Sequence, residues 1–359
     1  MSLRCLRPDL PPASSFTVAE LPHYAKLDQN EAPVDLPAEL KRELVAELAQ
    51  RPWNRYPQPA QYVEAKRKLA AVIGVDPDSL CLTVGCDQAI LAAFHVAGGP
   101  GRRARWFEPT YPYIPLAARL THTSGEGVAL GVDVDTAIDA AAIVAEPAPD
   151  LVVLVAPNNP TGGSPCAEAV DAAIDDEGRL VFIDEAYADF SGETRIPDVE
   201  HHPNLVIGRS LSKALLADIR LGFVVAHPEI IGALEQLFTA PYHLNALQLV
   251  VAGRYADIAP HVAASVAAVV TERQRVTDAL AAVHDIEPVP SRANFVLFRV
   301  AGDRQRSHAV YETLAKSGVR IRDVGGLPGL ASYLRVTIGT KRDNAAFLAA
   351  LGEALRGEV

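Results

Sequence analysis

The chain has 359 residues, of which 49% are hydrophobic and 21% charged, so it can bury a sizeable core as two domains or one large α/β unit and is not intrinsically disordered. Its formal net charge of −11 at pH 7, with basic residues scattered along the chain, argues against a nucleic-acid-binding surface. The four cysteines lack the spacing of a metal site, and no apolar run approaches the roughly 20 residues of a membrane span. We therefore expect a soluble, cytoplasmic protein whose partners are small molecules.

The first 36 residues are rich in proline and irregular, and helical patterning begins after them. A helix is predicted over residues 37–50, because Pro37 suits the first helical turn and Glu39 places an acid near the amino end of the helix. A loop containing Tyr56 follows, and a second amphipathic helix is predicted over residues 62–73.

A short strand over residues 79–84 stops at Gly85-Cys86-Asp87 and leads into an apolar helix over residues 88–96. A strand, a glycine turn and a helix amino terminus together favour phosphate binding, because free backbone N–H groups and the helix dipole point at the anion. Many such units bind nothing, so this turn is one candidate phosphate site among others.

An aromatic loop follows the next predicted strand, over residues 104–107, and it contains Tyr111. This loop is either a packing corner or part of a binding site. The alanine-rich stretch at residues 133–148 is predicted to be an ordinary helix.

Three β-branched strands without polar alternation come next, as is typical of strands buried on both faces of a parallel sheet, at residues 150–156, 179–183 and 204–208. Polar residues follow each of them: Asn159, Asp184 and Lys213 respectively. Because the carboxyl ends of parallel strands lie along one edge of the sheet, we expect these side chains to converge. A carboxylate buried at the end of a strand is costly unless paired, so Asp184 should face a cation.

Lys213 differs from the other six lysines, because it alone follows an apolar run, in the turn Ser210-Leu211-Ser212-Lys213. A lysine amine at the carboxyl edge of a sheet can act as a nucleophile. The alternative is a solvated surface side chain.

The remainder of the chain predicts one further strand and then a smaller α+β domain. The strand covers residues 218–227, and a long helical tract continues to about residue 283. Strands are then predicted at 294–298, 319–322 and 334–338, and helices at 305–316 and 342–355. We expect a large domain at 37–247, and a small domain formed by 1–36 and 248–359.

These residues suit one cofactor in particular. Pyridoxal phosphate needs a lysine for its Schiff base, an acid that keeps its pyridine nitrogen protonated, and anchors for its phosphate. Lys213, Asp184 and the turn at Gly85 to Asp87 could supply them.

The ordered motifs resemble those of the fold-type I, class I/II aminotransferases, and they cover essentially the whole chain. These motifs are Asn-Asn-Pro-Thr-Gly at 158–162, Asp-Glu-Ala-Tyr at 184–187, Ser-Leu-Ser-Lys at 210–213 and Arg-Leu-Gly at 220–222. Others resemble the histidinol-phosphate aminotransferase branch: Asn30-Glu31-x-Pro33, Arg55-Tyr56-Pro57, Pro109-Thr110-Tyr111, Ala293-Asn294-Phe295 and 334–339. The resemblance implies a mostly parallel central sheet between helices in the large domain, plus a smaller α+β domain.

The resemblance also implies the roles of individual residues toward pyridoxal phosphate. Lys213 would form the Schiff base and move a proton, and Asp184 would bind the pyridine nitrogen. Tyr187 and Asn159 would contact the 3′-oxygen, and Tyr111 would stack on the ring.

By the same resemblance, the cofactor phosphate is held by backbone N–H groups and side chains from several segments, and one tyrosine reaches in from the second subunit of a homodimer. These residues are Cys86, Asp87, Ser210, Ser212, Arg220 and, across the interface, Tyr56. Arg335 would take the carboxylate or phosphate of the substrate, and Asn30 belongs to the same substrate-binding set. Arg322 is either a second anion contact or part of a surface ion pair.

Some positions depart from the pattern of these aminotransferases. The segment between Lys213 and Arg220 is one residue shorter and lacks a glycine, Val34-Asp35 replaces the usual Gly-Pro, and His243 replaces an asparagine.

These departures leave the substrate open. We expect an aminotransferase that moves an amino group from histidinol phosphate or a related amino acid to a 2-oxo acid. The alternatives are a decarboxylase similar to threonine-phosphate decarboxylases, an elimination, cyclisation or oxidation enzyme, and a binding-only homologue.

Overall fold

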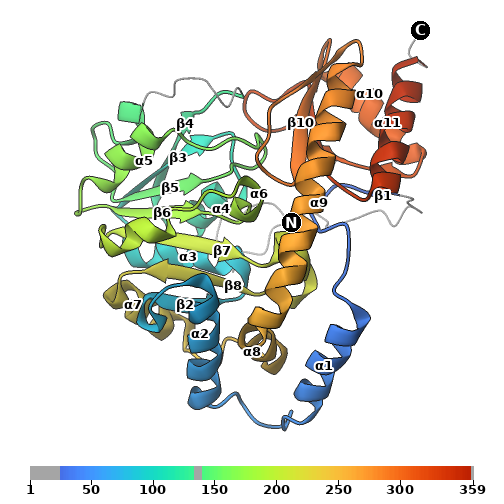
Figure 1. Cartoon of the computed structure of the whole chain (residues 1–359). Coiled ribbons are helices and arrows are strands. Elements are labelled where there is room, and N and C mark those ends of the chain that lie inside the picture. The colour runs from blue at the N-terminus through green and yellow to red at the C-terminus, as the bar shows by residue number, and fades with distance from the viewer. Residues whose placement is uncertain (1–24, 133–139, 357–359) are drawn as a thin grey trace, which may run out of the picture.

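A seven-stranded sheet forms the centre of the larger part of the molecule (Figure 1). The computed structural model describes residues 25–132 and 140–356. The strand order is β2-β8-β7-β6-β5-β3-β4, and β8 runs in the opposite direction to the other strands. The strands are β2 (Leu80–Thr83), β3 (Arg103–Glu108), β4 (Ser124–Ala129), β5 (Leu151–Val155), β6 (Leu180–Asp184), β7 (Leu205–Ser210) and β8 (Gly222–Ala226). The predicted α/β class with a mostly parallel sheet is confirmed.

Alternate residues of the central strands pack against helical layers on opposite faces of this sheet. In β5, Val152 and Leu154 belong to one apolar core, whereas Leu151, Val153 and Val155 belong to the other. Because both of its faces are covered, β5 is apolar throughout. The first core includes α2 (Pro59–Ile73), α5 (Ala167–Ile174), α8 (Ala246–Gly253) and α9 (Tyr255–Ala281), and the second includes α3 (Gly85–Ala97), α4 (Tyr113–Leu120) and α7 (Pro228–Phe238).

The smaller part of the molecule contains a four-stranded antiparallel sheet, of order β12-β13-β10-β9, and the parallel pair β1 and β11. The long helix α9 runs from the large sheet to this smaller part (Figure 1). The elements are β1 (Ala25–Lys26), β9 (Ile286–Pro288), β10 (Phe295–Val300), α10 (Arg304–Lys316), β11 (Val319–Arg320), β12 (Arg322–Asp323), β13 (Tyr333–Thr337) and α11 (Lys341–Arg356). The domain boundaries at residues 37, 247 and 248 stay a prediction.

Several predicted elements differ from the observed ones at their ends. The first helix is α1 (Ala38–Ala49), as expected, but α2 begins at Pro59 rather than at residue 62. Helix α3 begins at Gly85, so the candidate phosphate turn forms the first turn of the helix. The helical tract after residue 245 is interrupted at Arg254, between α8 and α9. Residues 188–191, for which no element was predicted, form the short helix α6 (Ala188–Ser191).

Two predictions need a larger correction. The helix predicted over 133–148 lies partly outside the described residues, and the described part holds only a 3₁₀ turn at Ala140–Ile143. Pro147 and Pro149 disfavour a continuing helix. Backbone carbonyls in residues 142–147 instead accept hydrogen bonds from the buried Arg105 guanidinium. The strand predicted from residue 218 begins at Gly222, because residues 217–219 form a 3₁₀ turn.

No helix within residues 25–132 and 140–356 is long and apolar enough to cross a membrane. The cytoplasmic location stays a prediction.

Candidate active site

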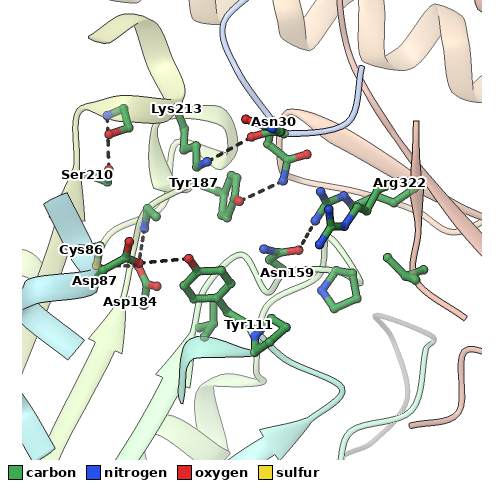
Figure 2. A pocket seen from close by; sticks show the side chains of 18 of the residues that line it. Asn30, Cys86, Asp87, Tyr111, Asn159, Asp184, Tyr187, Ser210, Lys213 and Arg322 are labelled. Carbon is green, nitrogen blue, oxygen red and sulfur yellow. Dashed lines mark hydrogen bonds between the residues drawn. The ribbon is translucent and has the colours of Figure 1, made fainter. Parts of the chain in front are cut away.

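A cavity of about 640 Å³ opens at the carboxyl ends of β5, β6 and β7, where it is also bordered by β12 and β13 of the smaller sheet. All but one of the site residues predicted from the sequence line it (Figure 2). These residues are Asn30, Cys86, Asp87, Tyr111, Asn159, Asp184, Tyr187, Ser210, Ser212, Lys213, Arg220, Arg322 and Arg335. The exception, Tyr56, is 75% exposed and makes an edge contact with Tyr242 outside this cavity.

Lys213 enters the cavity from a π-helical turn, Ser212–Leu216, that directly follows β7. Its Nζ donates a hydrogen bond to the backbone carbonyl of Gln29 at 3.2 Å, and no described acid forms an ion pair with it. Lys66, by contrast, is buried and paired with Glu235 at 2.8 Å. The Lys213 amine is therefore not committed to a carboxylate and is available for chemistry.

Asp184 ends β6 as a buried carboxylate. Its Oδ1 accepts hydrogen bonds from the Cys86 thiol at 3.0 Å and from the Ala186 backbone N–H at 2.9 Å. Oδ2 has no hydrogen-bond partner among the described residues, and none of their cations forms an ion pair with this carboxylate, although a cation was expected. Burial accordingly raises the pKa of the Asp184 carboxyl to about 6.

A corner that contains Arg220 and Asp87 lies beside the amino end of α3. Arg220 donates from Nη1 to Ser212 Oγ at 3.2 Å, and its Nη2 lies 3.5 Å from Asp87 Oδ2. Gly85 has a φ of +71°, and a Cβ on it would lie 3.0 Å from Arg220 Nη2, so a larger residue would crowd this corner. A guanidinium and a helix amino terminus together suit a phosphate group.

Tyr111 and Ser210 border the same corner. The Tyr111 hydroxyl donates to Asp87 Oδ1 at 3.0 Å (Figure 2). Burial beside Asp87 raises the pKa of Tyr111 well above its ordinary value, so the hydroxyl stays protonated. Ser210 Oγ accepts the backbone N–H of Ser212 at 3.3 Å.

Two guanidinium groups face the opposite side of the cavity. Arg335 on β13 lies directly across from Arg322 on β12, and neither forms an ion pair within the described part of the chain. Arg335 is buried above the ring of Phe295 and donates to Asn159 Oδ1 and to the Asp28 carbonyl. Burial lowers its pKa to about 10, which still leaves it charged at neutral pH. Two like charges without a carboxylate partner are arranged to receive an anion.

The sequence did not indicate the main-chain contacts of residues 28–30. The carbonyls of Asp28 and Gln29 accept hydrogen bonds from Arg335 and Lys213, respectively. The Cys86 thiol contact to Asp184 was also missed, because Cys86 was expected to act through its backbone. Backbone acceptors have no residue-type signature, so no pattern could have indicated these contacts.

The site fits the cofactor expected from the sequence. Asp184 leaves one carboxylate oxygen without a hydrogen-bond partner among the described residues, and the N–H⁺ of a pyridinium in the cavity could pair with it. Lys213 offers a free amine, and Arg220 with Ser212 offers a place for a phosphate. The roles of the individual residues stay predictions.

Comparison with known proteins agrees with this geometry. Residues 22–351 match the family model described as aminotransferase class I and II. Histidinol-phosphate aminotransferase 2 of Bordetella parapertussis is 33% identical over 356 residues, which is 98% of this chain and 96% of that protein. Histidinol-phosphate aminotransferase of Thermobifida fusca is 36% identical over 355 residues, 96% of this chain and 94% of that protein.

A solved structure has the same fold. The histidinol-phosphate aminotransferase of Sinorhizobium meliloti, in complex with pyridoxal-5′-phosphate, matches with a TM-score of 0.81 and 22% sequence identity. The match covers 94% of this chain and 92% of that one.

Replacing Asp184 by asparagine should change how the stability of the cofactor-free protein depends on pH. The carboxyl pKa is raised from its ordinary 3.8 to about 6, so it stabilises the fold below about pH 4, and this contribution is lost as the pH rises through about 6. The free energy of unfolding of Asp184→Asn, relative to the wild type, should therefore increase by on the order of 3 kcal/mol between pH 4 and pH 8.

Denaturant unfolding of both proteins across this pH range measures the difference. Asp218→Asn, at an exposed position, is the matched control and should show no such change. A difference for Asp184→Asn that does not vary with pH would show that the carboxylate is not buried without a partner.

Proposed function

The chain belongs to the class I and II aminotransferase family, and we propose that its amino donor is histidinol phosphate or a closely related anionic amine. It is a pyridoxal-phosphate-dependent aminotransferase, which takes an amino donor and a 2-oxo acid as substrates. The observation that carries the choice of donor is the pair Arg322 and Arg335, whose guanidinium groups line the cavity without a carboxylate partner among the described residues.

Pyridoxal phosphate, when bound, supplies an aldehyde that condenses with amines and a ring that accepts the electrons released at the substrate Cα. Lys213 would hold the cofactor and then take and return the Cα proton, since its amine has no acidic partner to compete. Asp184 would keep the ring nitrogen protonated, because a positive charge on that nitrogen would offset the cost of burying the Asp184 carboxylate.

Asn159 and Tyr187, in the loops that follow β5 and β6, would contact the phenolic oxygen of the ring, and Tyr111 would cover one face of the ring. Asn159 is itself held by Arg335, so a substrate anion that engages Arg335 would also act on Asn159. Arg220, Ser212 and the first turn of α3 would anchor the cofactor phosphate.

A donor with a phosphate suits the paired arginines well. A dianion can accept hydrogen bonds from two guanidiniums at once, and burial of Arg335 strengthens that attraction. The names of the relatives from Bordetella parapertussis, Thermobifida fusca and Chlorobium luteolum, each a histidinol-phosphate aminotransferase, support the same donor. Decarboxylation is not favoured by these relatives.

Incubation of the purified enzyme with histidinol phosphate and no acceptor tests this function. The absorption band of bound pyridoxal phosphate should convert to that of pyridoxamine phosphate, and adding 2-oxoglutarate should restore it. Aromatic, basic and other phosphorylated amino acids serve as comparison donors, and we expect kcat/KM to be at least about 10-fold lower for donors without a phosphate. Release of carbon dioxide, or turnover without any pyridoxamine form, would contradict the proposal.

A matched pair of variants separates substrate recognition from catalysis in the same assay. Arg322→Gln should raise KM for histidinol phosphate by about 10-fold or more with a smaller change in kcat, because one anion contact is lost. Arg299→Gln, which removes a partly exposed arginine paired with Glu287 on the same sheet, should leave KM unchanged. An unchanged KM for Arg322→Gln would remove this arginine from the substrate site.

We further propose that the enzyme is a homodimer whose sites are shared. Large apolar side chains are exposed around the loop between α1 and α2, including Trp53 at 77%, Tyr56 at 75% and, against Tyr56, Tyr242 at 55%. Exposed aromatic groups of this kind favour an interface. Tyr56 does not line the cavity of its own chain, which is consistent with a contact to the cofactor phosphate of a second copy.

Tyr56→Phe should weaken cofactor binding without affecting the fold. Loss of one hydrogen bond to a phosphate should raise the Kd of pyridoxal phosphate by roughly 10- to 100-fold, measured by fluorescence titration, with the midpoint of unfolding of the cofactor-free protein unchanged. Tyr311→Phe, on α10 away from the cavity, is the control. A fully active monomer in sedimentation and activity measurements would refute the shared site.

A further inference from the structure

Asn30 lies at the edge of the cavity with a strained backbone that hydrogen bonds hold in place. Its backbone has a φ of 56°, in the left-handed region, and the residue is 1% exposed. Its N–H donates to Thr337 Oγ1 at 2.9 Å, and its carbonyl accepts from Asn294 Nδ2 at 3.0 Å. Both partners belong to the smaller sheet region, so that part of the molecule fixes the backbone of Asn30.

The same contacts decide which way the Asn30 amide points. Thr337 Oγ1 accepts the Asn30 N–H, and its single proton is then donated to Asn30 Oδ1 at 3.0 Å. Thr337 is 2% exposed and has no other acceptor among the described residues, so the reversed amide would leave a buried hydroxyl proton unpaired. Oδ1 therefore faces Thr337, and the amino group faces away from it.

That amino group fixes the role of the Tyr187 hydroxyl. Asn30 Nδ2 lies 2.9 Å from the Tyr187 oxygen (Figure 2), and because an amide nitrogen can only donate, the tyrosine oxygen must accept. The Tyr187 ring is held edge-on against Phe295, with ring centroids 5.3 Å apart. The hydroxyl proton of Tyr187 is not needed for this contact and remains available to an acceptor in the cavity that Tyr187 lines.

We propose that Asn30 is a positioning residue that holds Tyr187 as a hydrogen-bond donor to the phenolic oxygen of bound pyridoxal phosphate, and that Thr337 orients Asn30 for this role. The inference rests on the proposed contact between Tyr187 and that oxygen. It assigns to Asn30 a function that acts through Tyr187 rather than through the substrate alone.

A hydrogen bond from Tyr187 would affect the pH at which the absorption of the bound cofactor changes. In the holoenzyme, loss of the proton on the nitrogen that would join Lys213 to the cofactor would leave more negative charge on the phenolic oxygen. A donor to that oxygen favours the deprotonated form and lowers the pH midpoint of the visible absorption change. Without Asn30, the Tyr187 hydroxyl is free to rotate and donate elsewhere, so the midpoint rises.

The experiment is a pH titration of the visible absorption of the holoenzyme, with no substrate present, for the wild type and three variants. Tyr187→Phe should raise the midpoint by about one to two pH units, the range expected for loss of a hydrogen bond to a charged oxygen. Asn30→Gly, which tolerates the left-handed backbone, should raise it in the same direction by a smaller amount. In the double variant the loss of Asn30 should add nothing to the shift of Tyr187→Phe.

The other ionisable groups that line the cavity are unchanged in all of these variants, so the shift reports on the Tyr187 hydroxyl. These groups are Asp28, Cys86, Asp87, Tyr111, Asp184, Lys213, Arg220, Arg322, Asp323 and Arg335.

Thr337 provides a second, independent pair. Thr337→Val removes the hydroxyl that orients Asn30 and should raise the midpoint, whereas Thr337→Ser retains that hydroxyl and should leave the midpoint at the wild-type value. If Asn30→Gly does not accumulate as folded protein, this pair makes the same comparison.

The outcomes separate the two proposals. An unchanged midpoint in Tyr187→Phe would overturn the contact of Tyr187 with the phenolic oxygen, and the role of Asn30 with it. Two results would overturn the role of Asn30 alone, provided that Tyr187→Phe shifts the midpoint. One is no shift in Asn30→Gly. The other is a double variant whose shift equals the sum of the two single shifts.

Discussion

The buried carboxylate of Asp184 is the constraint on which the rest of the site depends. Removal of a charge from water costs several kcal/mol unless a partner offsets it, and the described residues supply only the Cys86 thiol and one backbone N–H. A cationic ring nitrogen would complete this arrangement. Lys213 follows β7 and Arg220 precedes the antiparallel strand β8, so both line the same cavity as Asp184 and could contact such a cofactor there.

The smaller sheet region contributes groups that reach across the cavity. Residues 28–30 connect the two parts, because Asp28, Gln29 and Asn30 contact Arg335, Lys213 and Tyr187, respectively. An anion that binds at Arg335 would therefore engage a residue that is hydrogen-bonded to the same short segment that contacts the lysine and the tyrosine.

The convergence of Asn159, Asp184 and Lys213 could be predicted from the sequence, because buried parallel strands end at a common edge. The facing pair Arg322 and Arg335 depends on the register of antiparallel strands, and the left-handed backbone of Asn30 depends on distant partners, so neither has a local signal. Alanine content suggested a helix over 133–148. Within the described residues only a 3₁₀ turn forms, because prolines disfavour a helix and buried Arg105 donates hydrogen bonds to the backbone carbonyls.

The central claim is that Lys213 is the residue that holds pyridoxal phosphate. Reduction of the holoenzyme with borohydride, followed by proteolysis and mass spectrometry, tests it most directly. The account predicts a phosphopyridoxyl adduct on the peptide that contains Lys213, and no adduct on the ion-paired Lys66. An adduct on another lysine, or holoenzyme that shows no adduct after reduction, would contradict it.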